Sequence, residues 1–195
     1  MSFIDPKTKE INCKIVYCGP PFGGKTTNLR QIYQNVTQGD GKKKGIVSLA
    51  EGVDRTLYFD FLPLSAGVLN GAKIRFHLYT VPGQPSYAKT RKIILKGVDG
   101  VVFVADSQVE RLEDNLASLK DLQANLVAEY GPDDGVPVIL QYNKRDLANI
   151  LPTVELNKLL NPGGFLELEG VATQGRGVME AFQAASKAVL KGLQV

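Results

Sequence analysis

The chain has 195 residues, of which 44% are hydrophobic and 22% charged, as is usual for a globular protein with one sizeable core. Its net charge of +3 is too small to indicate nucleic-acid binding, and no apolar run approaches the ~18 residues of a membrane span. Cys13 and Cys18 stand at an odd spacing and would face opposite sides of one strand, so we expect two reduced thiols, as in cytoplasmic proteins. The printed ends carry neither a signal peptide nor a lipidation motif, so we expect no membrane anchor intrinsic to the chain.

The first predicted strand and helix enclose a glycine-rich segment. Residues 11–18 are predicted to form a short strand, and the apolar residues after the segment recur at the spacing of one helix face: Leu29, Ile32, Tyr33 and Val36. Between them, Gly19–Thr27 has the G-x-x-x-x-G-K-[ST] spacing of a phosphate-binding loop. Backbone N–H groups at the start of such a helix bind phosphate, Lys25 would reach the outer phosphates, and the Thr26 hydroxyl would ligate Mg²⁺. The residues expected to contact the nucleotide here are Gly19, Phe22, Gly23, Gly24, Lys25, Thr26 and Thr27.

The next part of the chain predicts a long polar loop followed by a hairpin. Residues 37–55 contain few apolar side chains, and Lys42–Lys44 within them is expected to be a solvated loop tip. Alternating apolar residues predict a half-buried strand that ends near Pro63 (Leu57, Phe59 and Phe61) and a second strand after the turn signal Asn70-Gly71 (Ile74, Phe76 and Leu78). The two strands should pair as an antiparallel hairpin, with His77 in a structural role on its polar face.

The remainder of the chain predicts buried strands that alternate with helices. Continuous apolar runs at 98–105 and 136–140 are typical of strands buried on both faces, and 165–168 is the last expected strand. Apolar residues at helix spacing predict a long helix over 112–130 and a closing helix over 178–189.

Strands that alternate with helices after a phosphate-binding loop predict an α/β fold of the P-loop NTPase type. We expect a three-layer sandwich with a six-stranded, mostly parallel sheet, the antiparallel hairpin at one edge, and residues 1–195 in a single domain. Ligands of such sheets bind at the carboxyl ends of the strands, where all of the candidate site residues fall. Asp106 also ends a strand there, but we expect it to cap the helix that follows.

The sequence N-K-x-D that starts at Asn143 favours guanine as the base. Asp146 would accept hydrogen bonds from the N1–H and the 2-amino group of guanine, two donors that adenine lacks. Asn143 would brace the base and the phosphate loop, while the Lys144 stem packs along the purine face. Ala172 and Thr173 follow the last strand, and a backbone N–H in this segment would contact guanine O6, although its sequence signal is weak.

Two further segments are placed to respond to a γ-phosphate. The backbone N–H of Gly83 would bind it and Gln84 would orient an attacking water, the alternative being that this Pro-Gly segment is simply a turn. Thr56 would add a second hydroxyl to Mg²⁺, and Arg55 would neutralise charge on the transferring phosphoryl group. From residue type alone, a solvated loop arginine is the favoured interpretation of Arg55.

Together these segments resemble the Ras-like small GTPases, and specifically the bacterial MglA family of polarity and gliding-motility GTPases. The resemblance covers nearly the whole chain and rests on residues 54–63, 75–84, 95–107 and 143–146. It implies a G-domain fold, GTP and GDP as ligands with Mg²⁺, and Arg55 with Gln84 as the catalytic pair.

The resemblance also implies partners and a location. In the family, the Roadblock-type protein MglB stimulates GTP hydrolysis by repositioning residues of the GTPase, without inserting an arginine. We therefore expect an MglB-like homodimeric activator and polarity or motility effectors for a chain that is monomeric alone, cytoplasmic, and recruited to a cell pole by partners. Thr80 stands where most small GTPases have a magnesium-associated Asp, a substitution shared by MglA proteins. Pro21 stands where the family usually has Gly, so either the loop keeps its shape without that N–H or basal hydrolysis changes.

The sequence therefore favours a GTP-hydrolysing molecular switch that turns over slowly alone and faster with a partner. Two alternatives stay open. A P-loop nucleoside or nucleotide kinase would need an acceptor pocket and an arginine-bearing lid, and the sequence indicates neither. A nucleotide-dependent scaffold would have lost GTP hydrolysis. The presence of Gln84 argues against this alternative, whereas Thr80 and Pro21 are compatible with it.

Overall fold

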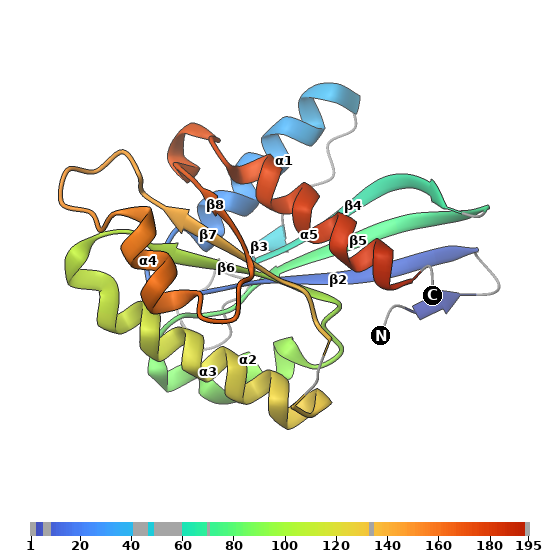
Figure 1. Ribbon diagram of the computed structural model, residues 1–195. Helices are drawn as coiled ribbons and strands as arrows, with labels where there is room; N and C mark the ends of the chain where they lie inside the picture. Colours follow the sequence, from blue (N-terminus) through green and yellow to red (C-terminus); the bar gives the residue numbers. More distant parts are fainter. Residues whose placement is uncertain are drawn as a thin grey trace.

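The computed structural model describes residues 3–5, 9–40, 47–48, 60–69, 71–132 and 135–193, and Figure 1 shows a sheet with helices on both faces. The main sheet has the strand order β4-β5-β2-β6-β7-β8. These strands are β4 (Asp60–Leu69), β5 (Ala72–Thr80), β2 (Glu10–Cys18), β6 (Gly100–Asp106), β7 (Val138–Asn143) and β8 (Leu166–Glu169). All neighbours are parallel except β4 and β5, so the predicted six-stranded, mostly parallel sheet with an antiparallel edge pair is confirmed. Two short strands, β1 (Phe3–Asp5) and β3 (Val47–Ser48), extend it by antiparallel pairing with β2 and β4.

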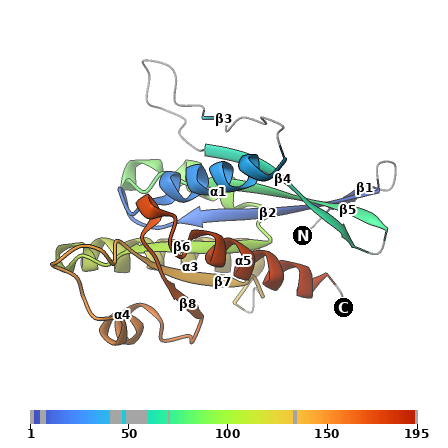
Figure 2. The same ribbon diagram turned by 90° about the horizontal axis from the view of Figure 1, so that it is seen from above.

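Helices form the outer two of three layers, as Figures 1 and 2 show. One apolar cluster joins α1 (Lys25–Asp40) and α5 (Val178–Gly192) to one face of the sheet. A second cluster joins α2 (Ala88–Leu95), α3 (Leu112–Tyr130) and α4 (Thr153–Leu160) to the other face. Cys13 belongs to the first cluster and Cys18 to the second, and both are free thiols, so the prediction of unbridged cysteines on opposite faces is confirmed.

The closing helix α5 fits the sequence pattern closely, because every residue that defined its apolar face is buried: Val178, Phe182, Ala185 and Val189. Phe182 meets Phe76 of β5 edge to face, with 5.7 Å between ring centroids. Fully burying one such side chain contributes ~1.5–3 kcal/mol, so this contact helps to hold α5 against the hairpin strand. The strands predicted from continuous apolar runs, β6 and β7, are buried along their whole length.

The hairpin differs from the prediction in two ways. Strand β4 does not end near Pro63 but continues to Leu69, pairing with β5 through a bulge between Ser65 and Val68. Pro63 stands opposite His77 in this pair, and a proline is tolerated in strands that lie near the edge of a sheet. The buried face of β4 is also the opposite of the predicted one. Asp60, Leu62 and Leu64 are buried, whereas the prediction placed Phe61 on the apolar face.

Other parts of the chain agree less fully with the sequence analysis. The first helix continues to Asp40, into the segment expected to be a loop, and the two short helices α2 and α4 were not predicted. The remainder of that loop, residues 41–46 and 49–55 with the basic run Lys42–Lys44, lies outside the described residues. His77 has the predicted structural role, because its Nε2 lies 2.8 Å from Asn12 Oδ1 and its ring stacks on Phe61.

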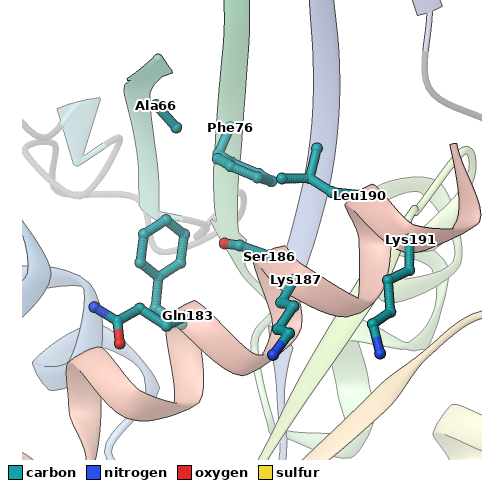
Figure 3. A pocket seen from close by; sticks show the side chains of 8 residues that line it. Ala66, Phe76, Gln183, Ser186, Lys187, Leu190 and Lys191 are labelled. Atoms are coloured by element: carbon teal, nitrogen blue, oxygen red, sulfur yellow. The ribbon is translucent and has the colours of Figure 1, made fainter. Parts of the chain in front are cut away.

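Among the residues that the structure describes, no helix combines the length and the apolar character that a membrane crossing requires. A surface hollow of about 530 Å³ lies between the hairpin and the end of α5 (Figure 3). Phe76 and Leu190 point toward one another inside it, and Lys187 and Lys191 point away from them. Because its lining shares no residue with the candidate site, this hollow is separate from the site described next.

Candidate nucleotide-binding site

The loop between β2 and α1 follows a path that only glycine permits at two positions. Gly19 and Gly24 have φ of +133° and +106°. A Cβ on Gly19 would lie 2.2 Å from the carbonyl oxygen of Val104, and one on Gly24 would lie 2.2 Å from Asn143 Nδ2. The turn between them is closed by the Gly23 N–H, which donates to the carbonyl of Pro20 at 3.2 Å. The motif glycines therefore fix a compact loop whose backbone leads into the start of a helix.

Lys25 is held inside this loop with its ammonium already oriented. Its Nζ donates to the carbonyl oxygens of Gly19 at 2.9 Å and Pro20 at 2.6 Å, and the residue is only 8% exposed. Burial lowers the pKa of Lys25 to about 8, because the charged form loses water that two carbonyls only partly replace. Phosphate oxygens beside this ammonium would supply the missing negative charge.

This environment predicts a pH dependence of nucleotide binding. Bound phosphates raise the pKa of Lys25 above its value of about 8 in the free protein, so binding at pH 9 should take up most of one proton. Affinity should be constant up to about pH 7.5 and fall as the pH rises through 8 and beyond. Calorimetry of GDP binding at pH 9, in two buffers with different ionisation enthalpies, measures the uptake. Equal heats in both buffers at pH 9 would contradict the assignment, and measurements at pH 7 are the control.

Asn143, the last residue of β7, joins two loops of the site. Its Nδ2 donates to the carbonyl of Gly23 at 2.8 Å, and its Oδ1 accepts the backbone N–H of Ala172 at 2.9 Å. The predicted bracing of the phosphate loop by Asn143 is therefore observed. The Ala172 N–H is engaged in that bond, which leaves the N–H of Thr173 as the candidate donor to guanine O6.

A cavity of about 260 Å³ opens beside this bridge. It is lined by Phe22, Gly24, Thr27, Asn143, Lys144, Asp146, Leu147, Ala172 and Thr173. The structure thus brings the candidate base-binding residues of two loops together with residues of the phosphate loop and its helix. Phe22 lines the cavity, 83% exposed and with a φ of +62°, a left-handed backbone conformation that is uncommon for residues other than glycine.

The Lys144 side chain is fixed by a contact that the sequence did not predict. Its Nζ lies 2.5 Å from Asp106 Oδ2 and 3.2 Å from Gln108 Oε1. The prediction that Asp106 caps the next helix is wrong: α3 has Arg111 as its N-cap residue and no side-chain cap bond. The short turn Val109–Arg111 separates the strand from the helix, so Asp106, fully buried, pairs with Lys144 instead.

A second polar centre lies beside Thr26, where the sequence predicts a magnesium ligand. Thr26 Oγ1 donates to Asp60 Oδ2 at 2.6 Å, and Thr80 Oγ1 donates to the same oxygen at 3.0 Å. The Asp60 N–H donates in turn to Thr80 Oγ1 at 2.8 Å, and Asp60 is buried. Sequence reasoning missed Asp60, although its position on the same strand face as Leu62 and Leu64 would have placed it inward. The Asp60 carboxylate thus lies beside Thr80, the residue that stands where most small GTPases have a magnesium-associated Asp.

The segment that follows β5 lies directly on the phosphate loop. A Cβ on Gly83 would be 2.4 Å from the backbone nitrogen of Pro21, so no larger residue fits in this arrangement. Gln84 is exposed at the same edge. The other two residues expected to respond to a γ-phosphate, Arg55 and Thr56, lie outside the described residues.

Pro21 is fixed in the loop by contacts of its own backbone. Its nitrogen faces Gly83, where no N–H is required, and its carbonyl oxygen accepts a hydrogen bond from Arg111 Nη2 at 2.8 Å. Arg111 is itself paired with Asp114 at 2.6 Å. These contacts join the phosphate loop to the Val109–Arg111 turn, and both outcomes left open by the sequence for Pro21 stay predictions.

Comparisons with known proteins agree with this arrangement. The model of the ADP-ribosylation factor family matches residues 60–189. The mutual gliding-motility protein MglA of Myxococcus xanthus is 55% identical over 195 residues, which span 100% of this chain and 98% of that protein. The human ADP-ribosylation factor-like protein 4A is 31% identical over 150 residues, 76% of this chain and 66% of that protein. These matches support GTP hydrolysis and not the nucleoside kinase alternative. The chain therefore belongs to the ADP-ribosylation factor family of Ras-like small GTPases and is of the MglA type.

Proposed function

We propose that this GTPase binds GTP and GDP with Mg²⁺ at the carboxyl edge of its sheet and controls cell polarity or motility through partners that distinguish the two nucleotides. The observation that carries the proposal is the pair of bonds from Asn143, which join the phosphate loop to the segment that we propose contacts guanine. The mutual gliding-motility protein MglA of Myxococcus xanthus, which is 55% identical, supports the link to gliding motility.

The proposed roles divide the site into three groups. Phosphate and ribose contacts come from Gly19, Phe22, Gly23, Gly24, Lys25, Thr26 and Thr27. Base contacts come from Asn143, Lys144, Asp146, Ala172 and Thr173, of which Ala172 acts through Asn143. Thr56 and Gly83 respond to the γ-phosphate, and Arg55 with Gln84 forms the catalytic pair, Gln84 orienting the attacking water.

The residues beside Thr26 suit Mg²⁺. This ion prefers oxygen ligands, keeps several waters, and is commonly held by one or two protein groups together with substrate phosphates. The Thr26 hydroxyl and the buried Asp60 carboxylate are 2.6 Å apart and supply such oxygens, with Thr56 as the second hydroxyl of the triphosphate state. Bound there, Mg²⁺ would neutralise charge on the phosphate oxygens.

Replacing Asp60 by asparagine should therefore raise the Mg²⁺ concentration needed to retain bound GDP by about tenfold, the effect of losing one charge-assisted contact. Asparagine keeps an oxygen that accepts hydrogen bonds from Thr26 and Thr80, so the fold should be unchanged. Release of a fluorescent GDP analogue at graded Mg²⁺ concentrations measures the change. Glu113→Gln, an exposed acid on α3, is the matched control. A Mg²⁺ dependence equal to that of the unmodified protein would remove Asp60 from the metal site.

We further propose a single domain over residues 1–195, monomeric alone, that interacts with a homodimeric Roadblock-type activator and is drawn to a cell pole by partners. The family match supports a regulated GTPase, and the sheet with its two covering helical layers includes elements from β1 to α5. The test is GTP turnover with and without a Roadblock-type protein, combined with the position in cells of a fluorescent fusion. Unstimulated turnover with every such protein, and a fusion distributed evenly in the presence of GTP, would contradict the proposal.

A further inference from the structure

Arg91 lies on α2 and joins three parts of the molecule through one guanidinium group. Its Nη1 donates to the carbonyl oxygen of Gln84 at 2.6 Å and to that of Pro82 at 3.2 Å. Its Nε donates to Asp121 Oδ2 on α3 at 2.7 Å. The side chain is only 11% exposed, and its bonds to Asp121 and Pro82 are partly buried, whereas the bond to Gln84 lies at the surface. The two carbonyls that it binds are those on either side of Gly83.

Gly83 is consequently held from two sides. On one side Arg91 binds the backbone before and after it, and on the other its Cα packs on the backbone of Pro20 and Pro21. A further polar contact of α2, from the Tyr130 hydroxyl to the Leu95 carbonyl oxygen at 3.5 Å, lies at the opposite end of the helix from this loop. The position of the loop over the phosphate loop thus depends strongly on this one side chain.

Arginine suits this task better than lysine does. Its planar fork of donors reaches a carboxylate and backbone carbonyls at the same time, and it stays charged at any physiological pH. Asp121 balances the charge and fixes the plane of the guanidinium against α3, a long helix whose Leu119 and Leu122 are buried in the core. Through Arg91 and Asp121, the loop is therefore attached to α3 and the core of the protein as well as to α2.

We propose that the Arg91–Asp121 pair is a positioning device that holds Gly83 and Gln84 in the arrangement that recognises and hydrolyses a triphosphate. This inference rests on the proposed roles of Gly83 at the γ-phosphate and of Gln84 at the attacking water. Arg91 acts through the backbone of the loop, so it serves discrimination between GTP and GDP as well as hydrolysis. GDP has no γ-phosphate for Gly83 to contact, so its binding should not depend on the pair.

Arg91→Ala should weaken GTP binding about tenfold and slow single-turnover hydrolysis about tenfold, as expected when charge-assisted bonds that order a loop are lost, while GDP affinity stays unchanged. Arg91→Lys should restore part of both losses, because an ammonium still pairs with Asp121 but cannot bridge both carbonyls with the same geometry. Asp121→Asn should produce a smaller shift in the same direction. Fluorescent GTP and GDP analogues measure the two affinities, and phosphate release measures hydrolysis.

Lys92→Ala removes the neighbouring, exposed cation of the same helix and should change neither affinity nor rate. Unchanged GDP affinity in Arg91→Ala shows that the protein is folded. Equal weakening of GTP and GDP, or no weakening of either, would overturn the proposal, as would an equal effect of Lys92→Ala.

Testing Arg91→Ala in a protein that already carries Gln84→Ala distinguishes the positioning role of Arg91 from the catalytic role of Gln84. In Gln84→Ala, adding Arg91→Ala should cause no further loss of hydrolysis but should still weaken GTP binding relative to GDP. If Gln84→Ala alone hydrolyses GTP normally, the catalytic role of Gln84 is wrong, while the GTP-to-GDP affinity ratio still tests Arg91. A ratio that does not respond to Arg91→Ala in either background would exclude the positioning role.

Discussion

Gln84→Leu should leave GTP bound while reducing partner-stimulated hydrolysis by about 10²–10⁴-fold, the usual contribution of a well-placed polar group to proton transfer or water attack. The Gln84 carbonyl is fixed by Arg91 and by the Tyr87 N–H, at 2.6 and 3.2 Å, so the backbone at this position is anchored. Its side chain is exposed at the phosphate edge. Leucine has a similar size but neither donates nor accepts a hydrogen bond, so it cannot orient water.

The companion variant Arg55→Ala should reduce the same rate by roughly 10³–10⁵-fold, the range for an arginine that stabilises phosphoryl transfer. Arg55 lies outside the described residues, so this expectation rests on the family resemblance. Phosphate release in single turnover, with and without a Roadblock-type activator, measures both variants. Gln123→Leu, an exposed glutamine on α3, is the control for the leucine substitution.

The two variants give separate answers. Undiminished stimulated hydrolysis in Gln84→Leu would mean that another group orients the water. The same result in Arg55→Ala would mean that the arginine is supplied by the partner or is not needed. Loss of GTP binding in either variant would contradict a role confined to hydrolysis, because both residues are expected to act on the transition state and not on the ground state.

Much of the fold could be predicted because its signals are local. The apolar runs of β6 and β7 and the helical spacing in α3 and α5 follow from residues close together in the sequence. The phosphate loop and N-K-x-D are also local, and the rule that ligands bind at the carboxyl ends of parallel strands was enough to bring them together. The bond from Asn143 to the carbonyl of Gly23 bears out that reasoning at 2.8 Å.

The features that sequence reasoning missed depend on contacts between distant segments. Which face of β4 is buried follows from its register against β5, and a shift of one residue exchanges the two faces. The alternation with Leu62 and Leu64 places Asp60 on the inward face, but its contact with Thr26, 34 positions away in sequence, depends on that register. Arg91 and Asp121 are separated by 30 positions and belong to helices whose packing had first to be known.

Asp146→Asn should lower the affinity for GTP by about 10²–10⁴-fold and create binding of xanthosine triphosphate. A carboxylate that accepts two hydrogen bonds contributes ~1.5–3 kcal/mol for each, and every ~1.4 kcal/mol changes affinity tenfold. Xanthine has a carbonyl where guanine has its 2-amino group, so the asparagine amide would donate to that oxygen and accept the N1–H. Competition of GTP, xanthosine triphosphate and ATP against a fluorescent GDP analogue for the unmodified protein, and against a fluorescent xanthosine diphosphate analogue for the variant, measures the change.

The substitution should affect the base alone, because the turn that carries Asp146 is fixed by other groups. The Arg145 N–H donates to Gly170 at 3.1 Å, and the Leu147 N–H donates to Lys144 at 3.2 Å. Neither bond involves the Asp146 side chain, which is exposed at the cavity. Loss of GTP binding with no gain of xanthosine triphosphate binding would therefore mean a collapsed loop, and unchanged preference for GTP would remove Asp146 from base recognition. A reversed preference, with Lys25 and the phosphate loop intact, would identify this carboxylate as the group that makes the site specific for guanine.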